Sequence, residues 1–206
     1  MNAPTSGADG PGDTAPRPGS GRPSGLSQGQ REDPVTGEDR LHVVFGTGQV
    51  GSALAAHLAG LGIPVRTVSR HRPAAPPGGA DWRAADVTDP EAAADAAKGA
   101  TVIYQCLNAP YTQWPELFPP LQRGVLAAAE RTGALLVSLE NLYGYGPTGD
   151  RPMTEDLPLA ATTVKGRTRA AMTAELLAAA DAGRVRIAIG RASVPRVARP
   201  AAMSGT

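Results

Sequence analysis

Cysteine and aromatic residues are scarce in this chain of 206 residues. The single cysteine, Cys106, means that no disulfide can form within the chain and that no zinc site can be built from cysteines. Aromatic residues make up 4% of the chain and hydrophobic residues 41%, so the core must be built from Ala, Val, Leu and Ile. A chain of this length is sufficient for one ordinary domain.

Net charge and long apolar runs are also lacking. The chain has 20 Lys and Arg against 19 Asp and Glu, without a basic stripe, which argues against nucleic acid as a partner. The histidines His42, His57 and His71 have no metal-ligand spacing, so no metal site is expected. No run approaches the roughly 18 apolar residues that span a bilayer, and no signal peptide is visible. We therefore expect a soluble, cytoplasmic protein with no membrane partner.

The N-terminal part differs in composition from the rest. Residues 1–38 are rich in Pro and Gly and contain few large apolar residues. Such a segment cannot bury enough surface to offset its conformational entropy, so we expect a disordered tail, and a passive extension is favoured over a functional one. We expect residues 39–193 to form a dinucleotide-binding Rossmann domain and residues 194–206 an irregular tail.

From residue 41 onward, short apolar segments typical of strands alternate with segments that have the apolar spacing of helices. Short apolar runs predict strands at residues 41–45, 65–69, 82–87, 101–107, 134–139 and 184–189. Helices are predicted at residues 49–61, with Val50, Leu54, Leu58 and Leu61 at helical spacing, at 89–98, from about 115 or 119 to 132, and at 163–182. Asp89-Pro90-Glu91 is typical of a helix start, with an N-cap, a proline at the first helical position and an early acidic residue. This alternation predicts an α/β, Rossmann-type, doubly wound parallel sheet covered on both faces.

A glycine-rich turn joins the first predicted strand to the first predicted helix: Gly46-Thr47-Gly48-Gln49-Val50-Gly51. In such a turn the first glycine permits the tight bend, the second lets the backbone approach a pyrophosphate, and the third lets the helix pack close to the sheet. The helix N-terminus then presents free N–H groups to the phosphates. We predict that these residues bind a dinucleotide; a turn that serves only packing is the alternative.

The end of the second predicted strand bears on which dinucleotide is bound. NAD sites place an acidic residue there to hold the ribose hydroxyls, whereas this sequence has Ser69-Arg70-His71-Arg72. A guanidinium group matches the geometry of a 2′-phosphate. We therefore predict NADP(H), with NAD less favoured and with Arg70 at the phosphate; the alternative is that Arg70 and Arg72 are solvated loop charges.

Residues near other strand ends are further candidates. Asp86, followed by Val87, can accept a hydrogen bond from an adenine amino group or can serve as a capping or loop residue, and both alternatives stay open. Tyr111 and Trp114 flank the loop after the fourth strand, where ligands of this fold bind, so we expect them to line a substrate pocket rather than only to cover the sheet edge. Cys106 is expected to be a buried, inert thiol.

With these motifs, residues 41 to 193 resemble the short-chain dehydrogenase/reductase superfamily, in its NAD-dependent epimerase/dehydratase (extended or atypical) branch. The resemblance rests on the glycine turn, on Asp86-Val87-Thr88-Asp89, on Asn108-Ala109-Pro110, on Asn141-Leu142-Tyr143-Gly144 and on the helix that contains Lys165. It implies a Rossmann sheet, a nicotinamide dinucleotide and a small-molecule carbonyl or alcohol substrate, often a sugar nucleotide.

The catalytic signature departs from that of the family. The resemblance implies a tyrosine four residues before a lysine that lowers the tyrosine pKa and holds the nicotinamide ribose, with a Ser or Thr nearby. Lys165 matches the lysine, but Ala161 stands in the tyrosine position and Leu139 in the Ser/Thr position. Lys165 and Tyr143, with Tyr145 as another substitute, are therefore the catalytic candidates; packing and surface roles are the alternative.

The C-terminal part departs from the family as well. The resemblance implies a substrate-binding lobe after the sixth strand, yet residues 194–206 match nothing expected there, so we expect this lobe to be largely missing, as in a truncated or frame-shifted gene product. Two functions follow: an NADP-dependent oxidoreductase or epimerase-like enzyme, or a non-catalytic NADP-binding sensor or degenerate enzyme fragment. A homodimer is left open.

Overall fold

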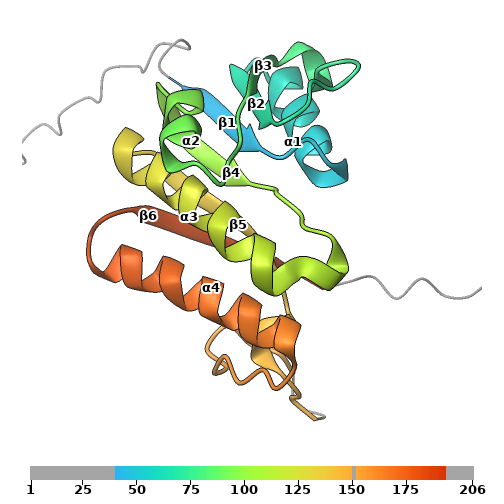
Figure 1. Ribbon diagram of the computed structural model, residues 1–206, viewed down its shortest axis with the longest axis vertical. Helices are drawn as coiled ribbons and strands as arrows, with labels where there is room; N and C mark the ends of the chain where they lie inside the picture. Colours follow the sequence, from blue (N-terminus) through green and yellow to red (C-terminus); the bar gives the residue numbers. More distant parts are fainter. Residues whose placement is uncertain (1–39, 150–151, 194–206) are drawn as a thin grey trace, which may run out of the picture. The chain divides into compact units, whose positions relative to one another are not determined.

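The computed structural model describes residues 40–149 and 152–193 (Figure 1). The expected tails, 1–38 and 194–206, lie outside the described residues. The strands are β1 Leu41–Phe45, β2 Val65–Ser69, β3 Asp81–Ala84, β4 Ala100–Gln105, β5 Leu135–Asn141 and β6 Arg186–Ala192. The α-helices are α1 Gln49–Gly60, α2 Pro90–Ala96, α3 Trp114–Thr132 and α4 Val164–Asp181, with short 3₁₀ helices η2 Pro77–Gly79, η3 Tyr111–Gln113 and η4 Tyr143–Tyr145. Each strand and helix predicted from the sequence is present, with ends shifted by a few residues.

The six strands form one parallel sheet in the order β3-β2-β1-β4-β5-β6. The chain builds outward from β1 to β3, then crosses back to place β4 on the other side of β1. This is the strand order of the Rossmann fold, so the predicted fold class is confirmed. The reversal between β1 and β4 leaves a crevice at the carboxyl ends of these strands, where ligands of open α/β sheets bind.

The two faces of β1 pack against different helices because successive side chains of a strand point to opposite faces. Val43 and Phe45 lie in a cluster with the alanines of α2 and with Val125 of α3. Val44 packs instead with Ala55 and Leu58 of α1. The sheet therefore lies between α1 on one face and α2 and α3 on the other (Figure 1).

The buried stripe of α1 differs from the one expected. Val50 and Leu61 are 53% and 63% exposed, and the buried residues are Gly51, Ala55 and Leu58. These three lie on one helical face, and Leu54 packs against the same cluster as Leu58, so two of the four expected apolar residues contact the core and two, Val50 and Leu61, do not. Small side chains on this stripe let α1 approach the sheet closely, which turns the bulkier Val50 and Leu61 toward solvent.

The sheet is less completely covered than expected. Side chains of β5 and β6 alternate, and Ile187 and Ile189 pack on the larger core cluster. On the opposite face Leu139 is 37% exposed and Ala188 is exposed. A Cβ added at Gly190 would have no atom within 4 Å, so this part of the sheet faces open space among the described residues.

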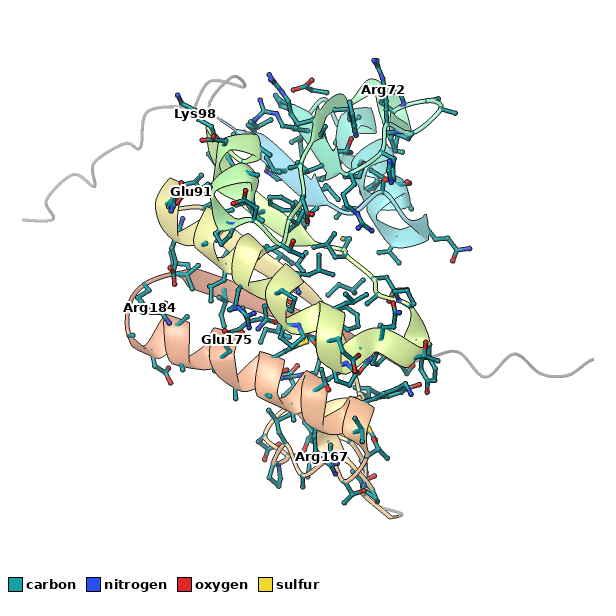
Figure 2. All side chains as sticks on the ribbon, viewed as in Figure 1. Arg72, Glu91, Lys98, Arg167, Glu175 and Arg184 are labelled. Atoms are coloured by element: carbon teal, nitrogen blue, oxygen red, sulfur yellow. The ribbon has the colours of Figure 1, made fainter. Side chains whose placement is uncertain are left out.

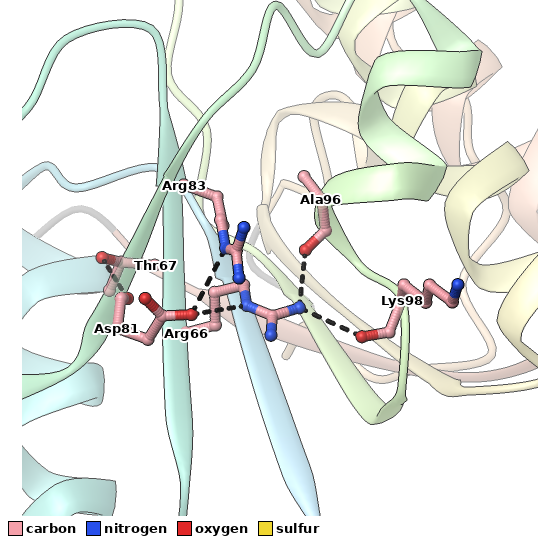
Figure 3. Close-up of polar contacts among 6 residues, drawn as sticks. All are labelled: Arg66, Thr67, Asp81, Arg83, Ala96 and Lys98. Carbon is pink, nitrogen blue, oxygen red and sulfur yellow. Dashed lines mark hydrogen bonds and ion pairs between the residues drawn. The ribbon is translucent and has the colours of Figure 1, made fainter.

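Polar contacts fix the amino-terminal ends of β2 and β3 to the end of α2 (Figure 3). The Arg66 guanidinium donates to Asp81 Oδ2 at 3.0 Å and to the carbonyl oxygens of Ala96 and Lys98 at 3.1 and 3.0 Å. Cations stabilise helix C-termini, where carbonyl groups lack partners within the helix. Asp89 caps the other end of α2 by accepting from the backbone N–H groups of residues 91 and 92, as the sequence predicts.

Ion pairs at the surface join α2 to α3, and α3 to the turn between α4 and β6. Glu91 pairs with Arg131 and Glu130 with Arg184, and Figure 2 shows Glu91 and Arg184 at the periphery of the molecule. Pairs of this kind each contribute little to stability because solvent screens them. Among the described residues, no helix combines the length and the apolar character that crossing a bilayer requires.

Candidate functional site

In the glycine turn after β1, two of the three glycines have no room for a Cβ atom and the third has room for one. Gly46 has a φ of 101°, and a Cβ there would lie 2.7 Å from the carbonyl oxygen of Cys106. A Cβ at Gly51 would lie 2.0 Å from the carbonyl oxygen of Gly46. A Cβ at Gly48 would meet no atom within 4 Å. Packing therefore explains Gly46 and Gly51 but not Gly48, whose open side faces the crevice.

The N-terminus of α1 points its free backbone groups toward the same crevice. Gly48 is the N-cap residue, it has no side chain to satisfy the first N–H groups, and the first turn of α1 contains no acidic residue. The Ser52 hydroxyl donates to the carbonyl oxygen of Thr47 at 2.9 Å, which fixes the turn without occupying those N–H groups. This end of the helix can therefore accept an anion.

A cavity of about 350 Å³ lies over the turn. Its lining brings together the predicted residues Gly46, Thr47, Gly48, Arg70, Asp86 and Val87, with Thr88 and Asn108 among those not predicted. Of the other turn residues, Gln49 and Val50 are exposed on α1, and Gly51 is buried beneath the turn. The unpredicted residues follow strands β3 and β4, and their place after strand ends was the available sequence signal.

The two arginines after β2 have different surroundings. The Arg72 guanidinium lies 5.7 Å from the centroid of the Trp82 ring, whereas Arg70 is exposed and lines the cavity. The acidic residue paired with β2 is Asp81, but it contacts Arg66 near the amino-terminal end of the strands, far along β2 from Ser69. No acidic residue therefore directly follows β2 in the sequence, and the carboxylate near Arg70 is that of Asp86, after β3.

Asp86 lies at the cavity and also has a local structural role. Its Oδ1 accepts from the Thr88 backbone N–H at 3.0 Å and from the Thr88 hydroxyl at 2.8 Å. These hydrogen bonds lower the pKa of Asp86, and the charge of Arg70 lowers it by a smaller amount. Val87 is 3% exposed, and its carbonyl oxygen lies where a Cβ at Gly124 would be, so α3 packs closely on it.

Lys165 and Tyr143 line a second cavity of about 680 Å³. Tyr111 lines it too, and the Lys165 ammonium lies 4.0 Å from the centroid of the Tyr111 ring. A hydrogen bond with Tyr111 raises the pKa of Tyr143, and the charge of Lys165 opposes this by a smaller amount. Trp114 is 8% exposed beneath, with its ring centroid 5.7 Å from that of Tyr143. Tyr111 therefore lines a cavity as expected, whereas Trp114, which was also expected to line one, is buried beneath Tyr143 and lines none of the described cavities.

The two cavities adjoin but share no lining residue. Pro110 lines the first and Tyr111, the next residue, lines the second. The structure therefore brings the residues after β1, β2 and β3 together, and separately brings Lys165 and Tyr143 together. Lys165, predicted to contact the dinucleotide, lies on the far side of the Pro110–Tyr111 junction from the glycine turn.

The sequence of the described region also matches a known family. Residues 46–175 match the family model described as NAD(P)H-binding, which covers more than half of the chain. The chain belongs to the NAD(P)H-binding family. No match was found among curated proteins.

Solved structures similar to this NAD(P)H-binding protein share its fold. A putative epimerase from Burkholderia cenocepacia J2315 is 24% identical, with a TM-score of 0.64 over 75% of this chain and 54% of that one. UDP-glucose 4-epimerase from Brucella ovis in complex with NAD is 18% identical, with a TM-score of 0.63 over 74% and 51%. A short-chain dehydrogenase/reductase superfamily protein from Agrobacterium tumefaciens with bound NAD is 23% identical, with a TM-score of 0.61 over 74% and 48%. The predicted resemblance is confirmed for the fold, and the chain spans about half the length of these proteins.

One buried ion pair of the NAD(P)H-binding protein was not predicted from the sequence. Glu140 and Arg169 are 3% and 5% exposed, and their charged atoms are 2.6 Å apart. Ser138 donates to Glu140 Oε1 at 3.2 Å, and Arg169 also lies over the Phe118 ring at 4.6 Å. Burial raises the pKa of Glu140, and Arg169 opposes this. A glutamate directly after the largely apolar segment 134–139 was the signal that could have revealed the pair.

Cys106 lines the smaller cavity beside the turn and is half-buried. Burial raises the pKa of its thiol to about 11, which agrees with the expected inert cysteine. Among residues 40–149 and 152–193 there is no group of three or more His, Cys, Asp or Glu side chains that could hold a metal ion.

Proposed function

We propose that this protein is an NADP(H)-dependent oxidoreductase or epimerase-like enzyme that acts on a carbonyl or alcohol compound. The single observation that carries the proposal is the glycine turn, in which Gly48 alone has an open Cβ direction and faces a cavity at the N-terminus of α1. An open glycine is unnecessary for packing and is what close approach of a pyrophosphate requires.

The residues present fit a dinucleotide at this site. The turn and the free N–H groups of α1 suit the pyrophosphate, and the charge of Arg70 suits a 2′-phosphate. Asp86 and Val87 line the same cavity, which supports their assignment to the adenine. The absence of an acidic residue directly after β2 in the sequence supports NADP(H) over NAD, because a carboxylate there would repel the 2′-phosphate.

A bound nicotinamide supplies or accepts a hydride. The residues that we assign to the reaction are Lys165 and Tyr143. Lys165 is the cation available to hold a ribose, and its ammonium is already oriented by the Tyr111 ring. The hydrogen bond with Tyr111 raises the pKa of Tyr143, which supports a role for Tyr143 as a neutral hydrogen-bonding group rather than as an activated base.

The first experiment is a titration of the purified chain with NADPH and with NADH, followed by nucleotide fluorescence. We expect NADPH to bind more tightly and Arg70→Ala to remove most of this preference, a loss of about tenfold or more for a charge-assisted phosphate contact. Arg72→Ala is the matched control, because Arg72 lies over Trp82 instead of lining the cavity. Equal binding of both nucleotides, or equal effects of the two variants, would refute the phosphate assignment.

The second candidate function is a non-catalytic NADP-binding sensor or a degenerate enzyme fragment. Ala161 in the tyrosine position favours it, as does the raised pKa of Tyr143, which is the opposite of the lowering expected of an activated tyrosine. NADPH binding without oxidation of NADPH in the presence of carbonyl compounds would support this candidate over the enzyme.

A further inference from the structure

Exposed apolar side chains gather at the 680 Å³ cavity beside Lys165. Tyr111, Met153 and Val164 line it and are 58%, 46% and 58% exposed. Leu142 and Pro147 add further apolar lining from the segment after β5. Apolar side chains that are both exposed and concentrated in one hollow indicate a surface that binds an apolar ligand.

Positive charge at this cavity is sparse. Among its described lining residues Lys165 is the one charged side chain, and its ammonium lies against the Tyr111 ring. Nearby arginines are engaged elsewhere: Arg167, labelled at the start of α4 in Figure 2, donates to the carbonyl oxygen of Thr162, and Arg169 is buried with Glu140.

A third arginine on this side of the molecule is also engaged. The Arg191 guanidinium lies 5.1 Å from the centroid of the Tyr145 ring, at a neighbouring cavity. Arginine is the side chain that most often recognises phosphate groups bidentately, and none of the described residues that line the cavity beside Lys165 is an arginine. The described lining therefore suits a neutral ligand better than a sugar nucleotide.

The lining also carries polar groups that can donate hydrogen bonds. Hydroxyl groups come from Tyr111, Tyr143 and Thr162, and the ammonium of Lys165 lies among them. These groups can donate hydrogen bonds, as a carbonyl oxygen requires. The two tyrosine rings and the Met153 thioether offer surfaces that pack well against an aromatic ring.

We propose that this cavity binds a neutral aromatic aldehyde or ketone, with its ring between Tyr111, Met153 and Val164 and its oxygen toward Lys165 and the tyrosine hydroxyls. The inference rests on the proposed function, since it names the substrate class of the same enzyme. It separates this chain from a sugar-nucleotide enzyme, whose ligand carries at least two negative charges.

The test is a ligand-observed NMR titration of the full chain with 2-acetylnaphthalene, with UDP-glucose as the competing ligand. We expect the ketone to bind with a Kd below about 1 mM, the range of weak but specific small ligands. UDP-glucose is expected neither to bind nor to displace it. Displacement of the ketone by UDP-glucose, or absence of ketone binding, would overturn the proposal.

Two matched variants locate the binding. Val164→Glu places a charge in the cavity at the first turn of α4, where an acidic residue favours the helix, so the fold should be kept. Leu177→Glu makes the same change on the same helix at a residue that is 44% exposed and lines none of the described cavities. We expect about fivefold weaker ketone binding for Val164→Glu and no change for Leu177→Glu. Equal effects would contradict the proposed site.

NADPH binding is measured on the same samples so that the two proposals can fail separately. NADPH binding without ketone binding overturns this inference and leaves the dinucleotide site intact. Ketone binding that depends on Val164, without NADPH binding, overturns the proposed enzyme and retains the aromatic site. Val164→Glu should leave the NADPH affinity unchanged, because Val164 does not line the cavity over the glycine turn.

Discussion

Replacing Gly48 and Gly51 by alanine should separate nucleotide binding from stability. Each substitution adds one methyl group, and the two positions are three residues apart on the same turn. At Gly51 it would lie 2.0 Å from the Gly46 carbonyl oxygen and 3.2 Å from Cys106 Cβ, so the backbone of the turn must move. At Gly48 it meets no atom within 4 Å, and the φ of −72° is accessible to any residue.

The expected magnitudes follow from these surroundings. Overpacking against a fixed backbone costs about 1–3 kcal/mol or more, so Gly51→Ala should lower the free energy of unfolding by about 3 kcal/mol. For a domain of this size, this is a fall in Tm of about 6–12 °C. Gly48→Ala should change stability by less than about 1 kcal/mol, because the weaker N-cap is offset by the lower entropy of the unfolded chain. It should nevertheless weaken NADPH binding by about tenfold or more, since its methyl group occupies the approach of the pyrophosphate.

The assay combines thermal unfolding by circular dichroism with NADPH titration. Gly60→Ala is the control: it lies at the end of α1, meets no atom within 4 Å, and should keep the NADPH affinity and leave the Tm unchanged or slightly raised, because alanine is the better helix former. A Gly48→Ala protein that binds NADPH like the parent would refute the reasoning about the open glycine. A Gly51→Ala protein with an unchanged Tm would refute the reasoning that Gly51 has no room for a Cβ atom.

Three further predictions concern residues outside the turn. Asp89→Ala should lower the free energy of unfolding by about 1 kcal/mol in urea denaturation, because the side chain caps α2, and an unchanged midpoint would contradict this. Burial raises the pKa of Glu140 above its ordinary 4.5, so the contribution of this side chain to stability is present below pH 4.5 and is lost as the pH rises through the folded-state pKa. The free energy of unfolding of Glu140→Gln, measured relative to that of the parent, should therefore increase as the pH rises above 4.5. A difference between the two proteins that does not change with pH would contradict this. Cys106, with a pKa of about 11, should react with a thiol reagent at pH 8 roughly a hundredfold more slowly than glutathione does, and denaturation should abolish the difference.

The sequence by itself determined the fold class and the order of its elements. Strands such as 41–45 are short apolar runs, and the glycine turn and the Asp89-Pro90 helix start are local signals that depend on backbone geometry and on nearby hydrogen bonds. Such signals act over a few residues, so they can be read without knowing what lies across the fold. The Rossmann strand order then followed from the alternation of strands and helices and from the position of the turn.

Only the tertiary structure decided which side chains meet. Of the apolar residues at helical spacing in α1, Leu54 and Leu58 pack on the core whereas Val50 and Leu61 are exposed, a difference that depends on how the helix is turned against the sheet and that periodicity alone does not specify. The placement of Lys165 against Tyr111, and of Arg169 beside Glu140, joins segments of the chain that are tens of residues apart. Contacts over such separations are set by how helices pack on the sheet, and no local pattern encodes them.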